Sequence, residues 1–129
     1  MTYNPDLKTA ALRHFSDGRK LHDDNRFDNA GYHYGFAAEC ALKHCLRNVG
    51  VRDDDDAIWK HFPTLRDIAR LSIKTRSAAP LRKVLERSSF MQFWDTKMRY
   101  ATDGAIDAKR AEKWRSDANE VIGLLYTHN

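Results

Sequence analysis

A long stripe of apolar side chains with helical spacing constrains the fold of this chain more than any other feature. Between residues 27 and 49, apolar residues recur every three or four positions, which is typical of a helix with one buried face. The stripe consists of Phe27, Ala30, Tyr34, Ala37, Ala38, Ala41, Leu42, Cys45, Leu46 and Val49. Gly31, Gly35 and Ala38 lie along one side of it, where small residues let another helix approach closely. Gly50 follows the stripe and predicts a left-handed C-terminal cap.

A first helix is predicted before this stripe. Asn4 is a favoured N-cap residue, Pro5 suits the first helical position, and Asp6 suits the positive end of the helix dipole. We therefore expect a helix that begins at Pro5 and ends near Asp24-Asn25.

Three further helices are predicted after the stripe. Thr64 with Asp67 resembles a capping box at the start of a short helix. Pro80 opens a helix that we expect to extend to about Tyr100, and Asp107 caps a last helix. Their inward-facing residues are predicted to be Leu81, Val84, Leu85 and Ser88 in the first of these two, and Ala111, Trp114, Ala118, Val121, Ile122 and Leu125 in the last.

No segment has the alternating pattern of a strand, so the predicted fold class is all-α. We expect one domain over residues 1–129, an up-and-down four-helix bundle with a short additional helix. No apolar run approaches the roughly 20 residues that span a bilayer, and the first residues do not resemble a secretory signal. The expected location is the cytoplasm, with no membrane partner.

Metal and cofactor chemistry is not predicted. Phosphate-binding glycine loops and paired CxxC motifs are missing from the sequence. His33 and His44 lie on one predicted helix about three turns apart, too far for one ion. Cys40 and Cys45 point in different directions, so we expect neither a disulfide nor a shared metal. The acidic run at residues 53–56 lacks the alternation and central glycine of a calcium loop.

The net charge of +4 is concentrated in the segment from Lys60 to Arg87. That segment contains the bases Lys60, Arg66, Arg70, Lys74, Arg76, Arg82, Lys83 and Arg87 and the acids Asp67 and Glu86. A basic segment of this kind is compatible with a nucleic-acid partner. It is also what a solvated helix face looks like, and both interpretations stay open.

Glu39 lies inside the most apolar stretch of the chain, where a carboxylate is costly unless it is paired. Lys43 follows four residues later, in the order that favours a surface pair on a helix. The alternative is that Glu39 turns inward. We predict a buried, hydrogen-bonded Glu39 that meets Arg99 or another base from a facing helix, in a structural ion pair.

Several motifs in this order resemble the HEPN family (higher eukaryotes and prokaryotes nucleotide-binding). The resemblance covers Ala10 to Leu125, and its motifs are Arg26-Phe27-Asp28-Asn29-Ala30, Gly35-Phe36-Ala37-Ala38-Glu39-Cys40-Ala41-Leu42-Lys43, His61 with Leu65, and Trp94 with Arg99-Tyr100. It implies an up-and-down four-helix bundle, a homodimer, and a prokaryotic setting beside a minimal nucleotidyltransferase. An aromatic surplus also favours a homodimer: Phe90, Phe93, Trp94, Tyr100 and Trp114.

Many members of that family are metal-independent ribonucleases with an R-x4-6-H motif. Arg99 matches the arginine, but Gly104-Ala105-Ile106 occupies the place where the histidine would fall. Arginine binds phosphate but does not shuttle a proton at neutral pH. The resemblance therefore does not carry ribonuclease activity to this chain, and we assign no catalytic residue.

The leading hypothesis is a dimeric HEPN-like partner of a nucleotidyltransferase that contacts nucleotide or RNA. The contacts would come from Arg99, Lys97 and Tyr100, with Trp94 or His61 nearby, since an arginine beside an aromatic ring can hold a phosphate and stack a base. One alternative is a ribonuclease toxin that uses His61 with Arg99. Another is a structural dimerisation module, in which the aromatic residues belong to the core and Arg99 neutralises Glu39.

Overall fold

The computed structural model describes residues 5–51, 60–73 and 78–126, and this part of the chain is helical and irregular, without strands. Three long helices form its body: α1 (Leu7–Asp23), α2 (Phe27–Asn48) and α6 (Ala108–Gly123). The shorter elements are α4 (Thr64–Ser72), α5 (Ala79–Glu86), and the 3-10 helices η2 (Thr96–Tyr100) and η3 (Leu124–Tyr126). The prediction of an all-α chain is confirmed for the described residues.

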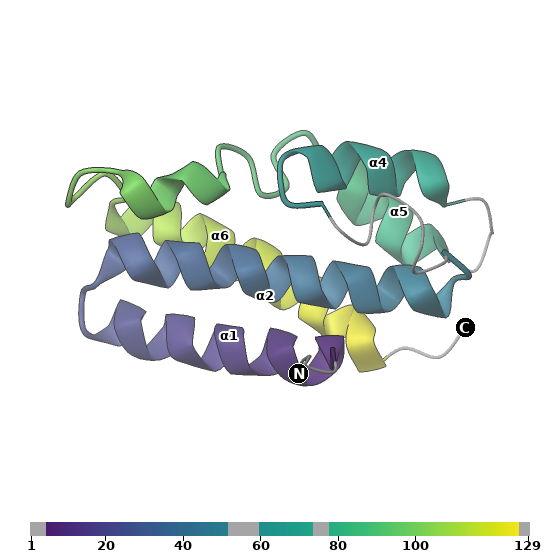
Figure 1. Cartoon of the computed structure of the whole chain (residues 1–129), viewed down its shortest axis with the longest axis horizontal. Coiled ribbons are helices and arrows are strands. Elements are labelled where there is room, and N and C mark those ends of the chain that lie inside the picture. The colour runs from purple at the N-terminus through teal and green to yellow at the C-terminus, as the bar shows by residue number, and fades with distance from the viewer. Residues whose placement is uncertain (1–4, 52–59, 74–77, 127–129) are drawn as a thin grey trace, which may run out of the picture.

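Helix α2 lies between the other elements. Helices α1 and α6 pack along one side of it, while α4, α5 and the segment leading to η2 cover another side (Figure 1). In Figure 1, α1 runs opposite to α2, and α6 runs in the same direction as α2. Within the described residues, no helix is both long enough and apolar enough to cross a membrane.

The ends of α1 and α2 follow from local sequence. Asp6 caps α1 by accepting a hydrogen bond from the Thr9 amide at 3.0 Å, so α1 begins two residues later than predicted. Helix α2 ends in a Schellman motif, with Gly50 in the left-handed region at φ +93° and the Val51 amide bonded to the Leu46 carbonyl at 2.9 Å. The predicted role of Gly50 is therefore confirmed.

The predicted helix from Pro80 to Tyr100 is wrong in its middle. Helix α5 stops at Glu86, where Arg87 is extended, and Met91 and Phe93 then adopt positive φ angles of 50° and 71°. Leu81, Val84 and Leu85 are buried as predicted, but Ser88 is exposed. Non-glycine residues with positive φ cannot continue a helix, so the chain returns along α2 as a series of turns.

The start of α4 also differs from the prediction. Its N-cap residue is Pro63, and no side chain caps the helix, so Thr64 and Asp67 do not form a capping box. Asp107, in contrast, caps α6 as predicted, with its carboxylate 2.8 Å from the Arg110 amide. The predicted inner face of α6 is buried throughout.

The glycines of α2 accommodate two tryptophan rings, and one of these rings, that of Trp114, belongs to the neighbouring helix α6. A Cβ atom on Gly35 would lie 1.9 Å from the Trp94 ring, and one on Gly31 would lie 2.9 Å from the Trp114 ring. The Trp94 Nε1 donates a hydrogen bond of 3.0 Å to the Gly31 carbonyl. The glycines therefore admit the rings of two tryptophans that come from the second half of the chain.

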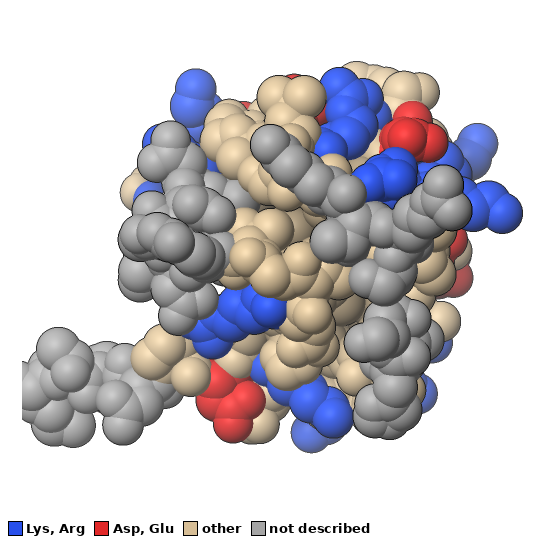
Figure 2. All heavy atoms as spheres, turned by 90° about the vertical axis from the view of Figure 1, so that its right-hand side faces the viewer, with Lys and Arg blue, Asp and Glu red and all other residues tan. Residues whose placement is uncertain are grey.

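The basic segment provides caps and ion pairs as well as surface charge. The Arg66 Nε donates to the Leu85 carbonyl at 3.1 Å, near the end of α5, and Arg82 donates to the Ile73 carbonyl at 3.3 Å, just after α4. Figure 2, which shows the right-hand side of Figure 1, has several Lys and Arg side chains on its upper part. Arginine side chains at helix C-termini satisfy carbonyls that have no partner within the helix.

Two carboxylates on the long helices hold the returning chain in place. Asp28, in the first turn of α2, accepts hydrogen bonds from the amides of Gly104 at 2.7 Å and Ile106 at 2.9 Å. Asp117 of α6 is 3% exposed and accepts from the Met91 amide at 2.9 Å. Lys113 and Arg87 lie beside Asp117 at 2.5 and 3.6 Å.

The cysteines are both free thiols, as predicted. Cys45 is buried, and burial raises the pKa of its thiol to about 11. The acidic run at residues 53–56 lies outside the described residues, so the prediction made for it is not addressed by the structure.

Candidate nucleic-acid interface

Glu39 is buried, with 2% of its surface exposed, and its partners come from the loop before α4. Its Oε2 lies 2.9 Å from the Nδ1 of His61, and its Oε1 accepts a hydrogen bond of 2.9 Å from the Phe62 amide. Burial raises the pKa of Glu39 above its ordinary value, while His61 and the Phe62 amide oppose that rise. The carboxylate therefore both fastens the loop and fixes the orientation of the His61 ring.

The partner predicted for Glu39 needs correction. Arg99 lies instead beside Tyr32 and Tyr100, and among the described residues His61 is the basic side chain within ion-pair distance of Glu39. Lys43 acts on Glu39 only as a nearby charge that lowers its pKa. The sequence indicated a buried carboxylate, but it did not indicate which base the chain would bring to it.

Arg99 is presented on the surface by η2. The Asp95 carboxylate caps this short helix by accepting from the Lys97 amide at 2.9 Å, which fixes the direction of the segment. The Cζ atom of Arg99 lies 5.0 Å from the centre of the Tyr100 ring. The nearby Tyr100 favours the charged form of Arg99 and raises its pKa. A side-chain hydrogen bond with Tyr32 is the next largest cause and acts in the same direction.

Tyr32, Phe36 and His61 form a row of partly exposed rings over α2, here called the α2 ring row. The Tyr32 and Phe36 rings meet edge to face, with centres 4.6 Å apart. The Phe36 and His61 rings meet similarly, at 6.3 Å. Arg99 and Tyr100 adjoin the Tyr32 end of the row, so a guanidinium and several rings share one side of the molecule.

The predicted binding residues differ in their access to solvent. Tyr100 is 78% exposed, the His61 side chain is 52% exposed, and Lys97 is exposed. Trp94 is 1% exposed and stacks beneath Tyr32, with ring centres 5.7 Å apart and 14° between the planes. Trp94 is therefore a core residue that supports the α2 ring row, and it offers no face to a ligand.

His61 and Arg99 lie at opposite ends of the row. Tyr32 and Phe36 occupy successive turns of α2 between them, and four helical residues rise about 6 Å. In Figure 1 the green segment that contains η2 covers the beginning of α2, whereas α4 begins farther along it. This arrangement suits contacts with successive nucleotides of a strand better than two contacts with one phosphate.

The place where the family motif would have a histidine is a backbone anchor. Gly104 and Ile106 donate their amides to Asp28, as described above, and Gly104 has a positive φ of 84°. This turn leads the chain into α6. Its residues supply no side chain that could transfer a proton.

Several residues of this site were missed in the sequence. Tyr32 and Phe36 were not assigned a role, although they lie four residues apart on the edge of the apolar stripe. Their spacing placed them together on one helix face, but their partial exposure depends on how closely Trp94 and η2 cover them. Asp28 was missed because its partners are backbone amides, which leave no trace in the residue types. Asp117 was missed because the Met91 amide and Arg87, which contact it, lie far from it in the sequence.

Comparison with models of known families, with curated protein sequences and with solved structures finds no match for this chain. The geometry of the site and the sequence motifs are therefore the features of this chain that bear on its function.

Proposed function

We propose that this protein binds single-stranded RNA or a nucleotide through the α2 ring row together with Arg99 and Tyr100. One observation carries the proposal: a charged arginine lies against the exposed Tyr100 ring and next to Tyr32. A guanidinium forks onto phosphate oxygens, and an exposed ring stacks on a base. Lys97, exposed in the same short helix, adds a second positive charge.

The wider setting is proposed from the sequence motifs. The protein would be a HEPN-type, non-catalytic dimer that partners a minimal nucleotidyltransferase in a prokaryotic cytoplasm. In a four-helix description, the segment of residues 79–100 would take the place of the third long helix. The Phe93 ring, which is 68% exposed, supports association with a second copy.

A second candidate function is cleavage of RNA without metal. The observation that favours it is the pairing of Glu39 with the His61 Nδ1, which leaves Nε2 as the remaining ring nitrogen. A carboxylate that orients an imidazole in this way is a familiar arrangement for a general base. The distance between His61 and Arg99 along α2 opposes it, since a general base and a phosphate ligand must meet at one reaction centre.

The proposal is tested with a short, fluorescently labelled single-stranded RNA at low salt, by fluorescence anisotropy. Arg99→Ala should weaken binding about tenfold or more, because a hydrogen bond to a charged group contributes about 1.5 to 3 kcal/mol. Tyr100→Ala should weaken it by a similar factor through lost stacking. Arg70→Ala, which removes an exposed arginine of α4, is the matched control and should leave the affinity unchanged.

Four results would contradict the proposal. Wild-type affinity in Arg99→Ala would remove the site, and an absence of RNA binding by the wild type would favour a purely structural dimerisation module. Degradation of RNA in the presence of a chelator, abolished by His61→Ala, would establish the ribonuclease alternative. A monomer in light scattering at tens of micromolar would remove the proposed homodimer.

A further inference from the structure

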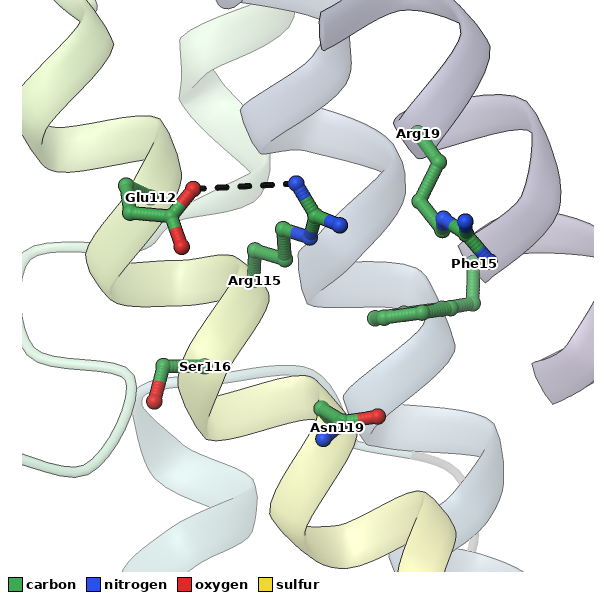
Figure 3. Close-up of a pocket in the computed structure, with 6 residues that line it drawn as sticks. All are labelled: Phe15, Arg19, Glu112, Arg115, Ser116 and Asn119. Atoms are coloured by element: carbon green, nitrogen blue, oxygen red, sulfur yellow. Dashed lines mark ion pairs between the residues drawn. The ribbon is translucent and has the colours of Figure 1, made fainter.

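A groove of about 510 Å³ lies between α1 and α6, away from the α2 ring row. Phe15 and Arg19 of α1 form one wall, and the other is formed by α6 through Glu112, Arg115, Ser116 and Asn119. Its volume falls within the range of small-ligand sites. Figure 3 shows the groove with the Phe15 ring extending from α1 toward α6, and the Arg115 side chain extending from α6 into the space between the helices, where it pairs with Glu112.

Positive charge reaches the groove from both walls. Among the described residues, the only ion pair of Arg115 is with Glu112. The two side chains are 3.8 Å apart, and the Glu112 side chain is 61% exposed. Such an exposed pair contributes little. Within the same part of the chain, Arg19 has no carboxylate within ion-pair distance. Two guanidinium groups from facing helices are thus available to one ligand, and Glu112 is the single carboxylate among the lining residues that would repel an anion.

The remaining lining fits a ligand that is more than an inorganic anion. Ser116 and Asn119 add a neutral hydroxyl and an amide. Phe15 adds an apolar ring, which is held in place by contact with the buried Tyr34 ring at 5.6 Å. A planar ring beside hydrogen-bonding groups suits a base or another flat heterocycle.

A chain of polar contacts links the buried Tyr34 to Glu112, which lines the groove. The Tyr34 hydroxyl lies 2.9 Å from the His22 Nδ1, and the His22 Nε2 lies 3.7 Å from Glu112. Glu112 therefore has a second neighbour, which lies near the same Oε2 atom that faces Arg115. An entering phosphate can replace Glu112 as the partner of Arg115 while Glu112 keeps a neighbour in His22.

From this arrangement we infer that the α1–α6 groove is a second binding site, for a phosphomonoester of the size of a mononucleotide. Arg19 and Arg115 hold the phosphate, and Phe15 lies against the flat part of the ligand. The site is separate from the α2 ring row and does not depend on the function proposed for that surface. A free mononucleotide and the 5′-phosphorylated end of an RNA share this chemistry.

Isothermal titration calorimetry with AMP, adenosine and inorganic phosphate tests the inference. AMP should bind, adenosine should bind at least tenfold more weakly, and phosphate should compete with AMP. Arg19→Ala and Arg115→Ala should each weaken AMP about tenfold or more, the expected loss of a charge-assisted hydrogen bond. Arg13→Ala, an exposed arginine of α1 outside the groove, is the matched control and should bind AMP normally.

Further variants sharpen the test. Phe15→Leu should weaken AMP binding but leave the affinity for inorganic phosphate unchanged. A 5′-phosphorylated dinucleotide that binds more tightly than AMP would identify an RNA end as the source of the phosphate. Equal binding of AMP and adenosine, or wild-type affinity in both arginine variants, would overturn the inference.

Discussion

Glu39 and Asp117 are both buried carboxylates that fasten an irregular segment to a long helix, but their partners differ. Glu39 holds the Phe62 amide and pairs with a half-exposed histidine. Asp117 holds the Met91 amide and pairs with a lysine and an arginine, Lys113 and Arg87, rather than with a histidine. The first attachment can respond to pH, whereas the second is permanent.

The pKa of Glu39 reflects this difference. Burial raises it above the ordinary value of 4.5, and a histidine is an incomplete counterion because it is charged only when protonated. Buried carboxylates keep their charge cheaply only when strong partners replace water. The loop before α4, which carries His61 of the candidate interface, is thus attached less firmly than the turns around Met91.

The largest effect is expected from Asp117→Ala. The change leaves the Met91 amide without an acceptor and removes the common partner of Lys113 and Arg87. We expect the free energy of unfolding to fall by about 3 kcal/mol, measured by urea denaturation with far-ultraviolet circular dichroism. Glu120→Ala, which removes only the exposed partner of Arg87, is the control and should cost less than about 1 kcal/mol. A loss below about 1 kcal/mol in Asp117→Ala would refute the permanent attachment.

Glu39→Ala should have a smaller effect, about 2 kcal/mol by the same measurement. The Phe62 amide again loses its acceptor, but His61 is half exposed and can be solvated by water. If this variant were as damaging as Asp117→Ala, the proposed difference between the two carboxylates would be wrong.

Asp28→Ala should cost about 1 kcal/mol. Its two amide partners, Gly104 and Ile106, lie at or near the surface, so water can replace the carboxylate. Hydrogen exchange of these two amides should rise while that of the Met91 amide stays unchanged. Unchanged exchange at Gly104 and Ile106 would contradict the assigned anchor.

Glu39→Gln should change the stability least at pH 7, by less than about 1 kcal/mol, because a neutral amide oxygen still accepts from Phe62 without the cost of a buried charge. Its signature is the pH dependence. Because the folded-state pKa of Glu39 is raised, the folded protein binds the proton more tightly than the unfolded chain. The stability of the wild type relative to Glu39→Gln should therefore fall as the pH rises from 4.5 through the raised pKa.

A rise over the same interval would mean that His61 stabilises the charged carboxylate more than burial destabilises it. The experiment compares urea midpoints of the two proteins at closely spaced pH values. Asp117→Asn, measured in parallel, serves as the reference for a carboxylate with permanent partners.

The sequence predicted the long helices well because their signals are local. The apolar stripe of α2, the Gly50 cap and the Asp107 cap depend on residues within a few positions of each other, and all three are present in the structure. The segment after α5 was mispredicted because Phe90, Phe93 and Trp94 have the spacing of a helix face. Packing of Trp94 against Gly35 overrides that local tendency and places Phe93 outside.

The candidate interface was only partly predictable for the same physical reason. The residue types of Arg99 and Tyr100 indicated binding chemistry, and the apolar surroundings of Glu39 indicated its burial. The pairing of Glu39 with His61 depends on a contact between residues 22 positions apart. No periodic pattern encodes a contact of that kind, so the choice between His61 and Arg99 required the tertiary structure.

The carboxylate anchors also bear on the order in which this chain folds. Helices α1 and α2 are neighbours in sequence and can associate early, whereas Asp28 must wait for amides 76 and 78 residues away. Closing so long a loop costs entropy before any contact compensates for it. The anchors then form after the rate-limiting barrier, and removing one should speed unfolding while leaving the folding rate nearly unchanged. The carboxylates of Asp28, Glu39 and Asp117 would thus set the unfolding rate of the native state, whereas the pairing of α1 with α2 sets the folding rate.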